Sequence, residues 1–113
     1  LGDVYKRQGS VDAANWYTVG TDSNGVTWSI DNDSVKKDDK KAVMDIKAMD
    51  YEGYHYIVTE EFNHKKREVK DLKVTLYNPQ GYVVKEEQVN KNSRKVEPGT
   101  PAYAVFQLIW GGK

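Results

Sequence analysis

Residues 96–110 read VEPGTPAYAVFQLIW, and they form the one stretch of this 113-residue chain with a clear helical pattern. Thr100 is a good N-cap, and Pro101 suits the first helical position because the amide hydrogen that proline lacks would have no partner there. Gly111 supplies the left-handed residue that commonly ends a helix. The sequence therefore predicts a helix that begins after Thr100 and ends before Gly111.

The predicted helix carries one apolar stripe. Its apolar residues are spaced i, i+3, i+4, i+7 and i+8, which places them on a single face. These residues are Ala102, Val105, Phe106, Ile109 and Trp110. A stripe of this size needs an apolar partner surface, and an antiparallel sheet with one apolar face is the natural one.

The sequence before the helix reads as strands separated by turns rich in Asp, Asn, Gly and Pro. We predict strands over 16–21, 26–31, 42–49, 54–62 and 82–89, and between the last two a fifth strand in which Leu72, Val74 and Leu76 point inward. The order of elements predicts an α+β fold, a six-stranded antiparallel meander sheet with one C-terminal helix on one face.

Three features do not fit a simple meander. Glu60 falls on the apolar side of its strand, which predicts a bulge or an edge position there. Residues 36–41 carry charges of both signs and are expected to form a tip in water. Residues 90–95 are expected to form a solvated loop that leads to the helix.

Residues 1–14 do not share the strand pattern, and we expect a disordered leader that is partly non-native. Residues 3–8 resemble a translated adapter sequence, and the small residues of 11–14 also fit the remnant of a signal-peptide cleavage region. Residues 15–112 are expected to form a single domain.

Composition narrows the classes of partner. Lys plus Arg and Asp plus Glu both number 17, so no net charge attracts nucleic acid or an anionic membrane. The chain has no cysteine, which excludes a disulfide, a thiolate zinc site and a thiol nucleophile. No apolar run is long enough to cross a bilayer. We expect no nucleic-acid partner and no transmembrane segment.

No residue pattern points to catalysis or to a metal. His55 and His64 are nine residues apart, which matches no familiar metal spacing, and we expect both to face solvent. Glu60 and Glu61 are successive strand residues that point to opposite faces, so they cannot share a substrate proton. We therefore expect a protein that is not an enzyme and that has no cofactor and no metal site.

Eight tyrosines are many for this length, and tyrosine is favoured both in strands and in interfaces. Our candidate partner-binding patch consists of Tyr17, Tyr51, Tyr54 and Tyr56 together with the basic run Lys65, Lys66 and Arg67. The alternative is that these are ordinary tyrosines of a sheet surface. An exposed sheet edge offers a second route to binding, and the outer side of the helix a third.

Several short motifs occur in an order that resembles the surface-adhesin protein E-like family over residues 15–110. They are Trp16-Tyr17-Thr18-Val19-Gly20, Asn24-Gly25, Ser29-Ile30-Asp31 with Asp33-Ser34-Val35, Tyr77 with Asn78 and Gly81, and Val96-Glu97-Pro98-Gly99-Thr100 before the terminal helix. The resemblance implies a small exported or surface-attached domain of Gram-negative bacteria. It also implies a twisted antiparallel sheet with one helix, sometimes dimeric, and a named member that binds host matrix and serum proteins.

From the resemblance we expect a non-enzymatic exported binding module of the envelope or cell surface that holds a protein partner, with a host matrix protein as one candidate. The alternative is a periplasmic accessory or inhibitor-like domain that acts through a loop such as residues 50–53. A homodimer through a sheet edge or the helix is also open. The resemblance further implies a cysteine pair near Asn63 and just after Trp110. This chain has Asn63 and Gly111 there, so we expect Phe106 and Trp110 to hold the helix instead.

Overall fold

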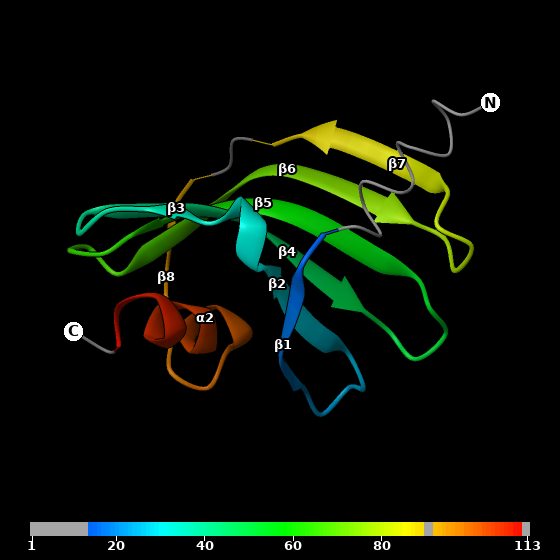
Figure 1. Cartoon of the computed structure of the whole chain (residues 1–113), viewed down its shortest axis with the longest axis horizontal. Helices are drawn as coiled ribbons and strands as arrows, with labels where there is room; N and C mark the ends of the chain where they lie inside the picture. The colour runs from blue at the N-terminus through cyan, green and yellow to red at the C-terminus, as the bar shows by residue number, and fades with distance from the viewer. Residues whose placement is uncertain (1–13, 90–91, 112–113) are drawn as a thin grey trace.

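The computed structural model describes residues 14–89 and 92–111, so the expected leader lies outside it except for Ala14. An antiparallel sheet runs in the order β1 (Trp16–Thr21), β2 (Thr27–Asp31), β4 (Lys41–Met49), β5 (His55–Asn63), β6 (Glu68–Tyr77) and β7 (Val83–Gln88). A 3₁₀ turn, η1 (Asn32–Ser34), follows β2, and one helix, α2 (Pro101–Trp110), follows the strands. The predicted α+β meander with a C-terminal helix is confirmed (Figure 1).

Two short strands extend the sheet where the sequence suggested only loops. β3 (Lys36–Lys37) pairs with β4 inside the expected charged tip, and β8 (Arg94–Lys95) pairs with the first residues of β6. The expectation of a solvated loop up to residue 95 is therefore wrong for β8. Its pairing depends on β6, which lies more than twenty residues away, and the local sequence carries no sign of it.

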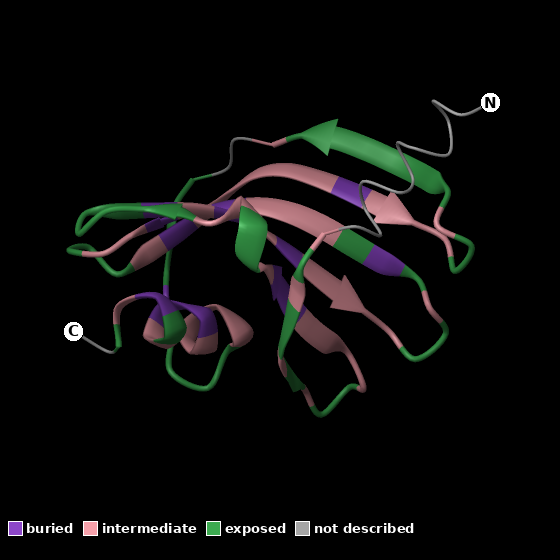
Figure 2. Ribbon diagram, in the orientation of Figure 1, coloured by how far each residue is buried: buried purple, intermediate pink, exposed green. Residues whose placement is uncertain are grey.

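Helix α2 has the predicted ends. The Thr100 hydroxyl accepts a hydrogen bond from the Tyr103 amide at 3.2 Å and donates one to the Glu97 carbonyl at 2.6 Å. Gly111 ends the helix with φ +65°, a backbone conformation that glycine adopts without steric cost. Val105, Phe106 and Ile109 are buried against the sheet (Figure 2). The predicted apolar stripe is confirmed.

Removing the N-cap should destabilise the domain measurably. We expect Thr100→Ala to lower the free energy of unfolding by about 0.5–2 kcal/mol, because the Tyr103 amide loses its acceptor. Thr100→Ser, which keeps the hydroxyl, is the matched control. Urea denaturation of both variants checks this, and an equal loss in the serine variant would show that the methyl group and not the cap matters.

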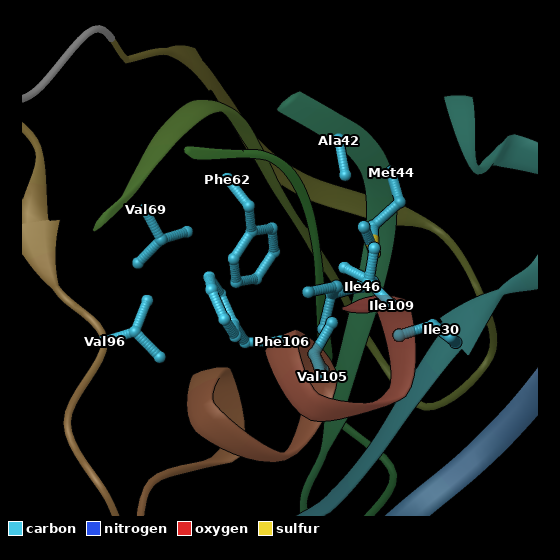
Figure 3. Close-up of a cluster of buried hydrophobic side chains, with 10 residues drawn as sticks. All are labelled: Ile30, Ala42, Met44, Ile46, Phe62, Val69, Val96, Val105, Phe106 and Ile109. Carbon is cyan, nitrogen blue, oxygen red and sulfur yellow. The ribbon is translucent and has the colours of Figure 1, made fainter. Parts of the chain in front are cut away.

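The core lies between α2 and one face of the sheet (Figure 3). It consists of Ile30, Ala42, Met44, Ile46, Phe62, Val69, Val96, Val105, Phe106 and Ile109. Of the fifth strand, Val69 is buried and not Leu72, Val74 or Leu76, which are only half-buried. The inward direction is confirmed for Val74 and Leu76, which pair with Val58 and Tyr56 on the face that carries α2. It is corrected for Leu72, which is the extra residue of a bulge, so Asp71 and not Leu72 lies opposite Glu60.

The C-terminal end of α2 is held by contacts between aromatic rings and by hydrogen bonds from side chains to backbone carbonyls. The Trp110 ring stacks on His64 with centroids 4.2 Å apart and packs edge-on against Phe106 at 4.9 Å. The Trp110 indole N–H donates to the Asp38 carbonyl at 3.1 Å, and the Lys37 ammonium donates to the Ile109 carbonyl at 2.7 Å. These contacts join the end of the helix to the turn after β5 and to the β3–β4 tip.

Candidate functional site

The face of the sheet that carries α2 is made of four cross-strand rows, because directly paired residues share a face. The first row is Ala42, Phe62 and Val69, and the second is Met44, Glu60 and Asp71. The third is Tyr17, Ile30, Ile46, Val58 and Val74, and the fourth is Trp28, Ala48, Tyr56 and Leu76. In the first row every residue is buried, whereas in the fourth none is.

Helix α2 is too short to cover all four rows. Ten helical residues span about 15 Å, whereas the nine residues of β5 span about 30 Å. Tyr56 in the fourth row remains 47% exposed, whereas Phe62 in the first row is completely buried. We call the partly exposed residues that β2, β4, β5 and β6 place in the third and fourth rows the uncovered apolar surface: Trp28, Ala48, Tyr56, Val58, Val74 and Leu76.

A pocket of about 550 Å³ opens where this surface meets the start of α2. Its walls are mostly apolar, and one side is charged. The lining residues are Trp28, Ile46, Val58, Glu60, Asp71, Arg94, Lys95, Glu97, Thr100, Pro101, Ala102 and Val105. The pocket is thus bounded by the sheet, by the N-terminal turn of the helix and by β8.

The charged side of the pocket is a cluster of three residues from different strands. Arg94 of β8 places one guanidinium nitrogen 3.2 Å from a Glu60 carboxylate oxygen and the other 3.2 Å from an Asp71 oxygen. Glu60 has only 9% of its side chain exposed, and Asp71 has 21%. Two adjacent carboxyl groups therefore share one cation.

The surroundings of Glu60 change its protonation. The pKa of Glu60 is raised to about 8, mainly by burial and then by the hydrogen bond with Asp71 and the negative charge of Asp71. Arg94 opposes the rise only in part. At pH 7 the Glu60 carboxyl is therefore mainly protonated. A register shift does occur at Glu60, but its extra residue is Leu72 of β6, so the bulge predicted for the strand of Glu60 lies in the neighbouring strand. The alternative of an edge strand is wrong, since β5 lies between β4 and β6.

The opposite face of the sheet carries aromatic and charged side chains. The Lys47 ammonium lies 4.6 Å from the centre of the Trp16 ring, and His55 stacks on Tyr77 with centroids 5.1 Å apart. A shallower hollow of about 250 Å³ crosses this face between Trp16 and Tyr77. Thr59 on its floor donates a hydrogen bond to Asp45 at 2.8 Å.

The seven residues predicted to form one contact patch lie in separate places. Lys65, Lys66 and Arg67 follow β5, whereas Tyr51 and Tyr54 precede it, about 30 Å away along the strand. Tyr17 lies on edge strand β1, three strands from Tyr56, or about 14 Å. All four tyrosines are exposed. Tyr56 belongs to the uncovered apolar surface, and Tyr17, which pairs with Ile30, lies on the same face of the sheet near Leu108 and Ile109. Their role in binding stays a prediction.

The histidines do not face solvent as expected. His55 is buried, and its Nδ1 lies 2.9 Å from the Gly53 carbonyl while its ring covers Tyr77. His64 is half-buried under Trp110. Both imidazole rings pack against aromatic rings. The spacing of the two histidines in the sequence gives no information about these contacts. Over residues 14–89 and 92–111, no three His, Asp or Glu side chains gather as a metal site would require.

Sequence reasoning missed Asp71 and Arg94 as parts of a site. The one sign in the sequence was that Glu60 falls on the apolar face of its strand. This pattern identifies an acidic residue in an unusual place, but it does not identify the residues that contact it. Asp71 is eleven residues away and Arg94 is thirty-four, and only strand pairing and the bulge bring them to Glu60.

Comparison with known proteins supports the resemblance seen in the motifs. The family described as surface-adhesin protein E matches residues 16–109, which include all the strands and nearly all of α2. Neither the curated proteins nor the solved structures compared with the chain give a match. None of the helices in the described residues is long and apolar enough to span a membrane. The chain belongs to the surface-adhesin protein E family.

Proposed function

We propose that this domain is a non-enzymatic, exported binding module of the cell surface that holds a protein partner on its uncovered apolar surface. The observation that carries this proposal is the fourth row, whose aromatic and aliphatic side chains extend beyond the helix. Membership of the surface-adhesin protein E family supports a role in adhesion.

The chemistry of this surface suits a protein partner. Tyr56 and Trp28 are residue types that recur as binding hot spots, since their rings bury much area and lose little rotamer entropy. Leu76 and Val74 extend the apolar area beside them. Tyr51 and Tyr54 lie at the turn that leads into β5, at the margin of the same surface.

A binding assay with purified host matrix glycoproteins tests the proposal. We expect Tyr56→Ser to weaken binding to the immobilised glycoproteins at least about tenfold, as for a hot-spot residue. Tyr82→Ser is the matched control, because Tyr82 is also exposed but precedes edge strand β7, and we expect it to change affinity less than about twofold. Surface plasmon resonance gives both affinities, and equal effects of the two variants would contradict the proposed surface.

The same assay addresses the alternative of a periplasmic accessory or inhibitor-like domain. Binding to purified envelope proteins but not to matrix glycoproteins, with sensitivity to changes in residues 50–53, would favour that alternative and reject the proposal. The homodimer also stays a prediction, and light scattering at high protein concentration that returned a monomer would remove it.

A further inference from the structure

The charges of the domain are separated along the sheet, although the formal charge of the whole chain is zero. The β3–β4 and β5–β6 turns lie together at one end of the sheet (Figure 1). Nine of the thirteen Lys and Arg residues that the structure describes lie in and beside these turns, and we call them the basic end: Lys36, Lys37, Lys40, Lys41, Lys65, Lys66, Arg67, Lys70 and Lys95. Residues 36–41 and 61–70 hold only four acids, Asp38, Asp39, Glu61 and Glu68.

The rest of the described chain has the opposite balance, with four bases and eleven acids. The turns at the other end of the strands, residues 22–26, 50–54 and 78–82, contain Asp22, Asp50 and Glu52 but no lysine or arginine. The nine residues of β5 separate the two ends by about 30 Å. Because the Debye length is about 8 Å at physiological ionic strength, a ligand at the basic end is screened from the acids at the other end.

The basic end is a continuous strip across several strands. The His64 amide donates to the Lys40 carbonyl at 2.9 Å, which joins the two turns. One cross-strand row then runs through Lys41, Asn63, Glu68 and Lys95. With strands about 4.8 Å apart, the backbones of Lys41 and Lys95 are about 14 Å apart. A single small anion cannot contact both of these lysines, whereas a chain of anionic groups can.

Several ammonium groups of the basic end are available to a ligand. In the part of the chain that the structure describes, no hydrogen bond or ion pair engages the side chains of Lys36, Lys65, Lys66 and Lys70. Three of the four acids, in contrast, have partners within the protein. Glu61 lies 3.9 Å from Lys41, Glu68 lies 3.6 Å from Lys95, and Asp38 accepts hydrogen bonds from two backbone amides of its own turn.

Arg67 holds its guanidinium in a defined place at the basic end. The guanidinium carbon lies 5.0 Å from the centre of the Phe106 ring. The backbone of Arg67 has φ +54°, a conformation that glycine adopts with less strain than arginine does. Arginine N–H groups form a planar fork that matches the oxygens of a phosphate, and a sulfate group presents its oxygens in the same way.

We propose that the basic end binds a linear sulfated polysaccharide, with Arg67 and the lysines of the two turns in contact with successive sulfate groups. Single-stranded nucleic acid is held by stacking on exposed aromatic rings, and a membrane by apolar side chains that insert into it. The basic end offers neither, since Phe62 is buried and the His64 ring is covered by Trp110. The choice of a polysaccharide over duplex nucleic acid rests on the exported location proposed above.

Surface plasmon resonance with immobilised heparin dodecasaccharide tests the proposal. We expect the wild-type domain to bind, with an affinity that falls at least about tenfold between about 50 and 200 mM NaCl, because each anionic contact releases counterions. The same oligosaccharide without its sulfate groups should bind at least about tenfold more weakly. These measurements do not depend on any variant folding. Equal binding of the desulfated chain would overturn the proposal.

A pair of double variants locates the site. Lys65→Gln with Lys66→Gln should weaken heparin binding at least about tenfold, since two cations without partners are lost. Lys73→Gln with Lys85→Gln is the matched control, because it removes the same charge outside the basic end, and we expect less than about a threefold change. Equal weakening by the two double variants would show that total charge, and not the basic end, attracts heparin, and would also overturn the proposal.

The competing polyanions are duplex DNA and vesicles that contain phosphatidylserine. We expect heparin to bind at least about tenfold more tightly than either at the same salt concentration, and equal or tighter binding of DNA or of the vesicles would reject a polysaccharide site. Tyr56→Ser should leave heparin binding unchanged, because Tyr56 lies in the fourth row and not at the basic end. The proposed protein-binding surface and the polysaccharide site therefore fail separately.

Discussion

Phe106→Ala is expected to lower the free energy of unfolding by about 3–5 kcal/mol, because it removes a completely buried ring and leaves a cavity. Phe106 packs edge-on against Trp110 and His64, and the Arg67 guanidinium lies 5.0 Å from its centre. A loss of this size is a large part of the 5–15 kcal/mol typical of whole domains.

Leu108→Ala is the matched control for Phe106→Ala, since Leu108 lies in the same helix but is 50% exposed. We expect it to change the free energy of unfolding by about 0.5 kcal/mol or less, as for most surface positions. Urea denaturation followed by tryptophan fluorescence measures both. A smaller loss for Phe106→Ala than for Leu108→Ala would mean that the helix does not hold the sheet as described.

The second large effect is a dependence of stability on pH that arises from Glu60. Its pKa is near 4.5 in the unfolded chain and about 8 in the folded protein, so folding takes up a proton between these values. The contribution of Glu60 to the free energy of unfolding is therefore full below about pH 4.5 and falls as pH rises through about 8. Each unit of pKa difference corresponds to about 1.4 kcal/mol, so the fall is on the order of a few kcal/mol.

Glu60→Gln should remove this dependence. The variant carries no titrating group at position 60, and we expect it to exceed the wild type in stability by about 1–3 kcal/mol at pH 9, where the wild type holds a buried charge there. At pH 5 the two should differ by less than about 1 kcal/mol, because a protonated carboxyl and an amide are both neutral hydrogen-bonding groups.

The difference between variant and wild type is the quantity to measure, since other carboxyl groups also titrate. Urea denaturation at pH 5, 7 and 9 gives it directly. Glu61→Gln is the matched control, because Glu61 has more of its side chain exposed and faces the other side of the sheet. Parallel pH profiles of Glu60→Gln and the wild type would show that Glu60 does not carry the proton.

The sequence predicted the parts of the fold that depend on neighbouring residues. The cap at Thr100, the stop at Gly111 and the apolar stripe between them are local signals, and the structure has each of them. The alternation and turns of the strands are local too. β8 was missed because Arg94 and Lys95 read as charged loop residues, and only β6 gives them strand partners.

The candidate site was harder to predict because its residues meet across strands. A bulge at Leu72 places Asp71, rather than a residue one step further along β6, opposite Glu60. The tyrosines and basic residues of the predicted patch lie far apart for a related reason. Tyr54 and Lys65 are near each other in the sequence, but the extended strand β5 lies between them. They therefore lie at opposite ends of that strand.

Edge strand β7 has a consequence for self-association. Val83 and Val84 are more than half exposed on a strand whose outer backbone is unpaired among the described strands, an arrangement that invites another chain to add a strand. Lys85 and Glu87 follow directly and pair with each other at 3.3 Å, and Glu86 pairs with Lys73 at 3.0 Å. An incoming strand would have to strip water from these charges, so growth of fibrils from this edge is disfavoured.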